Sequence, residues 1–184
     1  SRFLYPVAHR GGVRSFAVHS HATAYSDSRM RSARNWLVCR NIGAYSDVRL
    51  ACSRAAGDFL FGRRGYEELP NAIDVETYRF KEPVRTDVRA QLGLDDAPVV
   101  GHVGRFSEQK NHRFLIDVYT ELARLRPEVR LMLVGDGPLR PGVEGIVAER
   151  GLADRVLFLG DRKDVASLYQ AMDMFLLPSL YEGL

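Results

Sequence analysis

The chain of 184 residues is 46% hydrophobic and 27% charged, a balance that is typical of a globular protein and argues against a disordered segment. Its length can bury a sizeable core and suffices for one domain or for parts of two. The net charge of +3, with no long run of like charges, argues against a nucleic-acid-binding tail. No apolar run approaches the roughly 20 residues of a membrane-spanning helix. Cys39 and Cys52, the only cysteines, suit a reducing cytoplasm better than a disulfide scaffold.

In the first half, short apolar segments alternate with helical patterns. Strands are predicted at residues 13–19 and 48–53, and a helix is predicted between them at residues 29–39. Ser53 is placed to cap the next short helix. The stretch 68–80, with its Pro, Asn and Asp, is typical of a loop that crosses between domains.

The second half repeats strand and helix in a clearer pattern. Continuous aliphatic runs predict buried parallel strands at residues 98–104, 129–135, 155–160 and 174–178. Asn111 and Asp164 are expected to cap two of the intervening helices, and a third helix is predicted at residues 141–150. The expected buried stripe of the helix after Asn111 consists of Leu115, Val118, Leu122 and Leu125. Alternation of this kind predicts an α/β fold with a doubly wound parallel sheet.

The predicted elements divide between two Rossmann-like domains. Residues 1–81 are expected to form the C-terminal part of the first domain, residues 82–97 a linker, and residues 98–184 the first part of the second domain. The linker contains a short predicted helix, residues 86–92, which Gly93 ends. Because a doubly wound sheet usually has about five or six strands, we expect both sheets to be incomplete in this chain.

The stretch GRFSEQKNH, residues 104–112, places two cations between a predicted strand and the start of a helix. Open α/β sheets bind ligands at the carboxyl ends of their strands, and a helix N-terminus favours anions. The guanidinium of Arg105 can grip phosphate oxygens with two hydrogen bonds, and the ammonium of Lys110 adds a mobile point charge. Together they suit a diphosphate better than a single carboxylate. The alternative is that both are solvated loop residues without a ligand.

Three other loops also follow strands, so they are expected at the same edge of the parallel sheet. The turn GDGP, which begins at Gly135, lets backbone approach a ligand closely. Asp161 and Arg162 lie before the next helix, and Glu182 follows the last predicted strand. A carboxylate beside two cations and a glycine turn would accept hydrogen bonds from sugar or ribose hydroxyls. Each loop alone is more often an ordinary turn, and only their convergence indicates a site.

Other ligand-binding motifs are weaker. The dinucleotide fingerprint Gly-x-Gly-x-x-Gly lacks its third glycine, and no Asp-x-Asp pair is present to chelate a metal between phosphates. His19 and His21 would share one face of a strand and could bind a metal, but no clear third ligand stands nearby. We therefore expect neither a metal nor a cofactor.

With these motifs assembled, the chain resembles the retaining glycosyltransferases of family 4, also called the group 1 family, which have the GT-B fold. The resemblance covers roughly residues 68–184 and rests on the segments LPNAID, VGRFSEQKN, LMLVGDGP, RVLFLGDRKDV and LYQAMDMFLLPSLYEGL. Residues 1–60 match more loosely, although AVHSHA and ACSRAAGDFLFG are similar to members that build exopolysaccharide or capsule. The resemblance implies two Rossmann-like domains, of which the first faces the acceptor and the second holds most of a nucleotide-sugar donor.

The resemblance also implies roles for the charged residues. Arg105 and Lys110 would bind the donor diphosphate and stabilise its charge as it leaves, the work that a metal does in other glycosyltransferases. Glu182 matches the first glutamate of the family's Glu-x7-Glu motif, which contacts the donor sugar. The second glutamate of that motif, which holds the ribose hydroxyls, would lie beyond this chain.

The remaining site residues are assigned by the same resemblance. The donor nucleotide would be bound by Gly104, Gly135, Asp161 and Arg162, the last two meeting the base largely through their backbone. His19 corresponds best to a histidine of the first domain that lies near the donor sugar and the reacting centre. Its neighbour His21 is the second choice, and a histidine that merely ends a strand is the structural alternative. No residue can be nominated as a protein nucleophile.

The helix predicted at residues 29–39 offers a second surface. Its basic residues, with one just beyond its end, are Arg29, Arg31, Arg34 and Arg40, and they surround Met30, Ala33, Trp36 and Leu37. A basic amphipathic helix can rest on anionic lipid, where a lipid-linked acceptor would be found. Similar enzymes dock through this part of the first domain. The alternative, which we favour, is that the apolar side packs on the sheet and the arginines are solvated.

The leading hypothesis is a cytoplasmic glycosyltransferase that acts in surface polysaccharide synthesis, with peripheral membrane contact as a further expectation. It would move a sugar from a UDP- or GDP-sugar to a glycan or lipid-linked acceptor with retention of anomeric configuration. The alternatives are a GT-B epimerase or phosphorylase, and a catalytically inactive module that binds nucleotide sugars. No nucleic-acid partner is expected. The sequence does not identify the base, the sugar, the acceptor or the linkage.

Overall fold

A computed structural model describes residues 3–26, 29–62 and 65–182. The contacts within the chain divide it into two compact units, Ser1–Ile73 with Tyr181–Leu184, and Asp74–Leu180. Among the described residues, none of the helices is both long and apolar enough to cross a bilayer.

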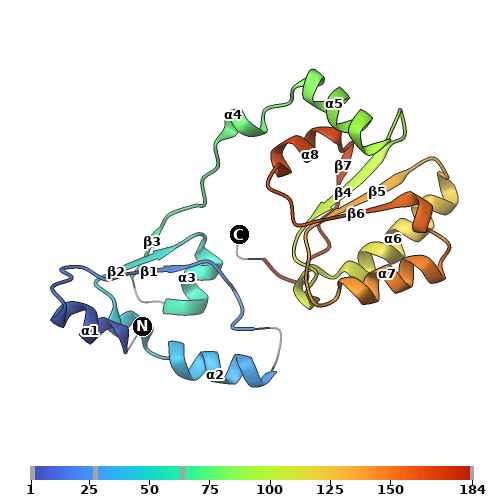
Figure 1. The fold of residues 1–184 in the computed structure, drawn as a ribbon. Coiled ribbons are helices and arrows are strands. Elements are labelled where there is room, and N and C mark those ends of the chain that lie inside the picture. The colour runs from blue at the N-terminus through green and yellow to red at the C-terminus, as the bar shows by residue number, and fades with distance from the viewer. Residues whose placement is uncertain (1–2, 27–28, 63–64, 183–184) are drawn as a thin grey trace. The chain divides into compact units, whose positions relative to one another are not determined.

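The described residues of the first unit form a parallel sheet of three strands in the order β1-β2-β3 (Figure 1). The elements are α1 (Leu4–Arg10), β1 (Ala17–Ser20), α2 (Arg29–Cys39), a 3-10 turn (Ile42–Tyr45), β2 (Val48–Ala51), α3 (Arg54–Phe61) and β3 (Glu67–Glu68). The two predicted strands and the predicted helix are thus confirmed, although both strands are shorter than expected. Ser53 caps α3 as predicted, because its Oγ accepts a hydrogen bond from the N–H of Ala56 at 3.3 Å.

Helix α1 was not predicted from the sequence, and none of its residues is buried. Polar contacts with Asp47 hold it in place: this carboxylate accepts hydrogen bonds from the hydroxyl of Tyr5 at 2.9 Å and from Nε2 of His9 at 3.0 Å. The same carboxylate accepts from the N–H of Phe16 at 2.7 Å, and these bonds hold the pKa of Asp47 below its ordinary value. A helix tied down by such contacts leaves little apolar periodicity for sequence reasoning to find.

The apolar side chains of α2 do not pack as we expected. Met30, Trp36 and Leu37 are 84%, 50% and 56% exposed, so the preferred arrangement, with this side of the helix on the sheet, is wrong for these residues. The guanidinium of Arg40 lies over the Trp36 ring, 5.7 Å from its centroid. The side chain of Arg29 falls outside the described part of the chain. Helix α2 therefore presents a surface that is both apolar and basic.

The described residues of the second unit form a parallel sheet of four strands in the order β6-β5-β4-β7 (Figure 1). Its strands are β4 (Val99–Val103), β5 (Arg130–Val134), β6 (Val156–Gly160) and β7 (Met174–Phe175). Its helices are α4 (Val75–Tyr78), α5 (Glu82–Leu92), α6 (His112–Leu125), α7 (Arg140–Glu149) and α8 (Val165–Ala171), with 3-10 turns at Glu108–Lys110 and Ala153–Arg155. The strand order reverses at β4, since β5 lies on one side of it and β7 on the other. This is the doubly wound arrangement that the sequence predicts.

Both faces of this sheet are covered by helices. On β5, Leu131 and Leu133 point into a core shared with α6 and α7. Met132 and Val134 point the opposite way, into a core shared with α5 and α8. Alternate side chains are therefore buried on both faces, which explains why the strand is one continuous apolar run.

The buried face of α6 differs from the predicted stripe. Leu115 is fully buried, but Val118 and Leu125 are 38% and 67% exposed, so two of the four expected positions are wrong. The face that packs on the sheet consists of His112, Leu115, Ile116, Tyr119 and Ala123. Tyr119 satisfies its hydroxyl by donating to the carbonyl of Val129 at 2.9 Å, which lets an aromatic residue occupy the core.

Residues 82–97, expected to link two domains, instead belong to the second unit. Helix α5 begins at Glu82, earlier than predicted, and packs on α8. Arg89 is 8% exposed and donates to the carbonyls of Asp95 at 2.8 Å, Ala97 at 2.6 Å and Ala171 at 2.9 Å. The division between the units falls after Ile73, and the hydrogen bond from Arg89 to Ala171 ties this segment to the end of α8.

Arg89 therefore offers a test of how this segment is held. In Arg89→Leu three backbone carbonyls, of which that of Ala171 is buried, lose their donor, and we expect the free energy of unfolding to fall by about 3 kcal/mol. Urea denaturation with an unchanged m-value measures this loss. The matched control is Arg124→Leu, whose side chain is 72% exposed and pairs with Glu121, and it should change stability by less than about 0.5 kcal/mol. Equal losses in both variants would contradict the assignment.

Candidate functional site

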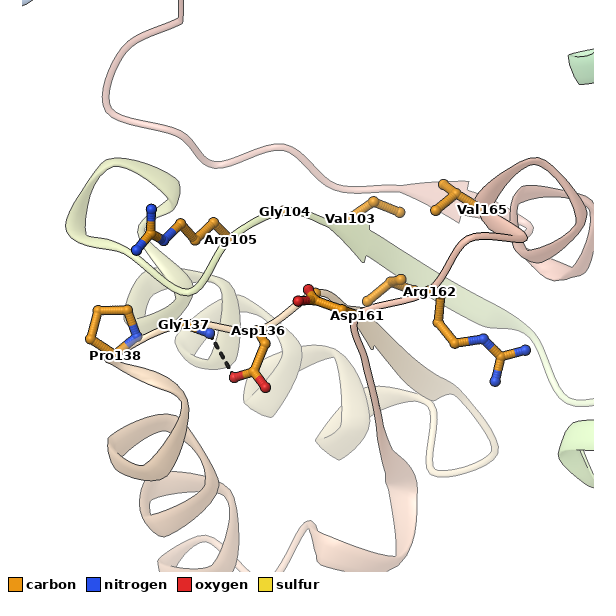
Figure 2. A pocket seen from close by; sticks show the side chains of 11 residues that line it. Val103, Gly104, Arg105, Asp136, Gly137, Pro138, Asp161, Arg162 and Val165 are labelled. Atoms are coloured by element: carbon orange, nitrogen blue, oxygen red, sulfur yellow. Dashed lines mark hydrogen bonds between the residues drawn. The ribbon is translucent and has the colours of Figure 1, made fainter.

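The carboxyl ends of β4, β5 and β6 surround an open cleft of about 780 Å³ (Figure 2). Its lining consists of Val103 to Arg105 at the end of β4, Val134 to Pro138 at the end of β5, and Asp161, Arg162 and Val165 after β6. The structure thus brings together five of the site residues predicted from the sequence: Gly104, Arg105, Gly135, Asp161 and Arg162. Three separate loops meet here because parallel strands end at one edge of the sheet.

The first two loops are bonded to each other through their backbones. The N–H of Phe106 donates to the carbonyl of Asp136 at 3.0 Å, and the N–H of Leu139 donates to the carbonyl of Phe106 at 3.2 Å. Gly135 has a φ of +123°, and a Cβ added there would lie 2.2 Å from the carbonyl oxygen of Gly104. No side chain fits at that distance, so glycine is required for the two loops to approach.

Arg105 is an exposed cation that lines this cleft. Its side chain extends from the loop after β4, near Pro138 (Figure 2). Within the described part of the chain, none of the ion pairs or side-chain hydrogen bonds involves it. A guanidinium in this state can present its donors to an incoming anion without first breaking an internal pair.

Lys110 does not line the cleft, but it lies beside it. Its Cδ and Cε atoms are 3.3 and 3.4 Å from the position that a Cβ on Gly104 would occupy. The half-buried stem of the lysine therefore packs against the residue that precedes Arg105. Both predicted cations thus belong to the end of β4.

Arg162 differs from Arg105 because its guanidinium is already paired. It donates to the two carboxylate oxygens of Asp164 at 2.8 and 2.6 Å. This contact raises the pKa of Arg162 and lowers the pKa of Asp164. The expectation that Asp164 caps α8 is therefore wrong: its side chain makes no capping bond and binds the arginine instead. Besides this paired arginine, the loop brings the exposed carboxylate of Asp161 to the cleft.

Two histidines that were not predicted as site residues from the sequence support the loop after β4. The ring of His112 stacks on Phe106, with centroids 4.0 Å apart and planes at 16°, and His102 meets it edge-on at 4.8 Å. His112 is only 2% exposed, and this burial lowers its pKa to about 4. The one available signal was the placing of His102 inside an otherwise apolar strand.

The buried His112 predicts how stability depends on pH. Its folded pKa of about 4 lies below the ordinary 6.5, so the unfolded chain binds more protons in that interval and stability falls as the pH drops through it. His112→Phe keeps the stack on Phe106 and removes the proton site. We expect the unfolding free energy of the variant to depend less on pH between about 6.5 and 4, as measured by urea denaturation at several pH values. An unchanged slope would contradict this assignment.

His19 and Glu182 lie in the first unit, by its own contacts. His19 is partly exposed on β1, and its ring centroid is 4.0 Å from that of His21, as expected for neighbours on one face. The backbone carbonyl of Glu182 accepts a hydrogen bond from the hydroxyl of Thr23 at 3.0 Å. Among the described residues that line the cleft, neither of the two predicted catalytic residues is found. In the same part of the chain, the histidines, cysteines and carboxylates form no group of three that could hold a metal ion.

The cleft lies in the part of the chain that matches a known protein family. Residues 97–184 match the model of the family described as Glycosyl transferases group 1. The predicted resemblance to the group 1 family is therefore confirmed for these residues, whereas the family 4 assignment and the retaining mechanism stay predictions. Residues 1–96 lie outside this match, but the relatives described next align with them as well.

The whole chain is similar to bacterial transferases. The putative glycosyltransferase EpsF of Bacillus subtilis (strain 168) is 35% identical over 195 residues, covering 99% of this chain and 50% of EpsF. A GDP-mannose-dependent alpha-(1-6)-phosphatidylinositol monomannoside mannosyltransferase of Mycolicibacterium smegmatis is 30% identical over 187 residues, covering 98% of this chain and 48% of that protein.

A solved structure is similar over the same range. Anabaena Alr3699/HepE in complex with UDP and glucose matches with a TM-score of 0.81 and 27% identity, over 97% of this chain and 51% of that one. The predicted α/β class with the GT-B type of Rossmann-like parallel sheets is therefore confirmed. The chain spans about half the length of these relatives.

Proposed function

We propose that the protein is a glycosyltransferase that moves a sugar from a UDP- or GDP-sugar to a glycan or lipid-linked acceptor in surface polysaccharide synthesis. The observation that carries this proposal is the cleft at the carboxyl ends of β4 to β6, where the unpaired Arg105 stands over glycine-bearing loops. Support comes from the group 1 match over this cleft and from the similarity to a protein solved with UDP and glucose.

In this proposal Arg105 and Lys110 bind the donor diphosphate. Negative charge grows on the diphosphate as the sugar departs, and the two cations at the end of β4 stabilise it where it develops. Gly104 and Gly135 leave room for the phosphates to approach backbone. The base is bound by the loop at Asp161 and Arg162 through its backbone, because the guanidinium of Arg162 is engaged by Asp164.

The two remaining roles rest on the family resemblance. Glu182 contacts the donor sugar, and His19 lies near the reacting centre, with His21 as the alternative. Retention follows from attack on the same face that the phosphate leaves, so no protein nucleophile is assigned. The relatives reported above are named as transferases, which favours transfer over an epimerase, a phosphorylase or an inactive binding module.

Removing either cation tests the assignment of the diphosphate site. Arg105→Ala and Lys110→Ala should each lower kcat/KM for the nucleotide sugar by roughly 100-fold or more, because a developing charge loses its partner. Arg124→Ala, an exposed arginine on α6, is the matched control and should keep full activity. Transfer assays with UDP- and GDP-sugars measure the effect. Full activity in both cleft variants would refute the assigned roles.

We propose further that no metal takes part, since the two cations supply the charge that a metal would. Transfer should then continue in the presence of EDTA at an unchanged rate, and added Mg²⁺ or Mn²⁺ should not raise it. A rate that disappears with the chelator and returns with the metal would contradict the proposal.

We also propose a peripheral contact with the cytoplasmic face of the membrane through α2. The exposed Met30, Trp36 and Leu37 lie on the same helix as the exposed Arg31 and Arg34, which is the composition of an interfacial helix. Such a contact would bring the protein to a lipid-linked acceptor.

Vesicle binding tests this contact. Sedimentation with phosphatidylglycerol vesicles should exceed that with phosphatidylcholine, because each arginine near an anionic surface contributes about 1 kcal/mol. Arg31→Glu with Arg34→Glu should reduce binding by roughly tenfold or more, and Trp36→Ala should weaken it as well. Arg124→Glu changes charge elsewhere and serves as the control. Equal binding by all variants would exclude this surface.

A further inference from the structure

The chain that follows β7 remains beside the end of β4, although strand pairing has stopped. Strand β7 pairs with β4 only through Met174 and Phe175. We call residues 176–180 the exit segment, since they lead from β7 towards Glu182. The N–H of Leu176 donates to the carbonyl of Gly101 at 2.9 Å, and Nδ1 of His102 donates to the carbonyl of Leu176 at 2.9 Å.

Two further hydrogen bonds come from the turn that carries Lys110. The N–H of Leu180 donates to the carbonyl of Gln109 at 2.9 Å. Nδ2 of Asn111 donates to the carbonyl of Pro178 at 3.3 Å. The exit segment is thus bonded to the same turn that holds one of the two cations.

Asn111 meets two demands at once. Its backbone is left-handed, with φ 52° and ψ 45°, a conformation that asparagine adopts more readily than most residues. Its side chain was expected to cap α6, and this is wrong: it makes no capping bond and reaches across to Pro178. Glycine could adopt this backbone conformation equally well, but it has no side-chain amide that could donate to the carbonyl of Pro178.

Leu176 packs against the core of the second unit, but the leucines beyond it bury little apolar surface, so this part of the exit segment depends on such polar contacts. Leu177 and Leu180 are 46% and 66% exposed. Without a large hydrophobic contribution, the loss of one hydrogen bond is a substantial share of what holds the backbone in place.

We propose that Asn111 is a positioning residue: its amide fixes the exit segment on the turn that carries Lys110, and so sets where the chain towards Glu182 leaves the second unit. This inference rests on the proposed function, in which Glu182 contacts the donor sugar and the cations bind the diphosphate. Asn111 therefore serves the sugar end of the donor and leaves the nucleotide end to Arg105 and Lys110.

The test compares Asn111→Gly and Asn111→Asp in the intact protein. Glycine keeps the left-handed backbone and removes the amide, while aspartate keeps the shape but has no donor for the Pro178 carbonyl. Asn41→Gly is the matched control, because Asn41 is also left-handed, with φ 61°, and its side chain makes no capping bond. Three quantities are measured: amide exchange of residues 176–182, the Kd for UDP, and kcat/KM for the nucleotide sugar.

We expect both Asn111 variants to exchange the Leu180 amide up to about tenfold faster and to lose kcat/KM by a similar factor, with the Kd for UDP unchanged within about twofold. Asn41→Gly should match the wild type in all three. Unchanged exchange, or equal losses in UDP affinity and turnover, would overturn the inference. If Arg105→Ala leaves UDP binding intact, the proposed function fails, yet the exchange result still decides whether Asn111 holds the exit segment.

Discussion

The site depends on the close approach of two backbones at the carboxyl end of the second sheet. At Gly135 a Cβ would lie 2.2 Å from the carbonyl oxygen of Gly104, and at Gly137 it would lie 2.6 Å from that of Phe106. Only glycine permits these contacts, and they place the loop with Arg105 directly against the loop after β5. A larger residue would separate the loops and move the guanidinium away from the cleft. The cleft thus depends first on two positions without side chains, Gly135 and Gly137, and Arg105 then supplies its positive charge.

The core beneath makes that approach reproducible. Because both faces of β5 are buried, its end can shift neither towards α6 and α7 nor towards α5 and α8 without opening a cavity. The stack of His112 on Phe106 extends this rigidity into the loop itself. Burial destabilises the charged form of an imidazole, and the pKa of His112 is lowered for this reason. The protein thus buries a neutral imidazole against the loop whose position determines where Arg105 lies.

Much of the second unit could be predicted because its strands are encoded by residues that are adjacent in the sequence. Continuous apolar runs identify β4, β5 and β6, and the loops after them then fall at one edge without further information. Elements held by distant polar partners could not be predicted in the same way. Helix α1 depends on Asp47, 38 residues from His9, and α5 is fixed by Arg89 reaching the carbonyl of Ala171, 82 residues away. No periodic pattern records such contacts. The buried face of α6 was misplaced for a related reason, since His112 and Tyr119 carry polar atoms and are nevertheless core residues.

The arginines show why a net charge says little about a site. The guanidinium of Arg89 donates to backbone carbonyls, that of Arg162 pairs with Asp164, and that of Arg140 pairs with Glu144 and Asp136, so their donors are already engaged by the protein. The family resemblance assigns Arg105 to the diphosphate and Arg162 to the base largely through its backbone, although both arginines follow a strand. Which of them is available depends on a carboxylate two residues further along, which Arg162 has and Arg105 lacks. Of the two guanidinium groups that line the cleft in the described part of the chain, that of Arg105 at the end of β4 is the one without a carboxylate partner, and backbone contacts already hold its loop.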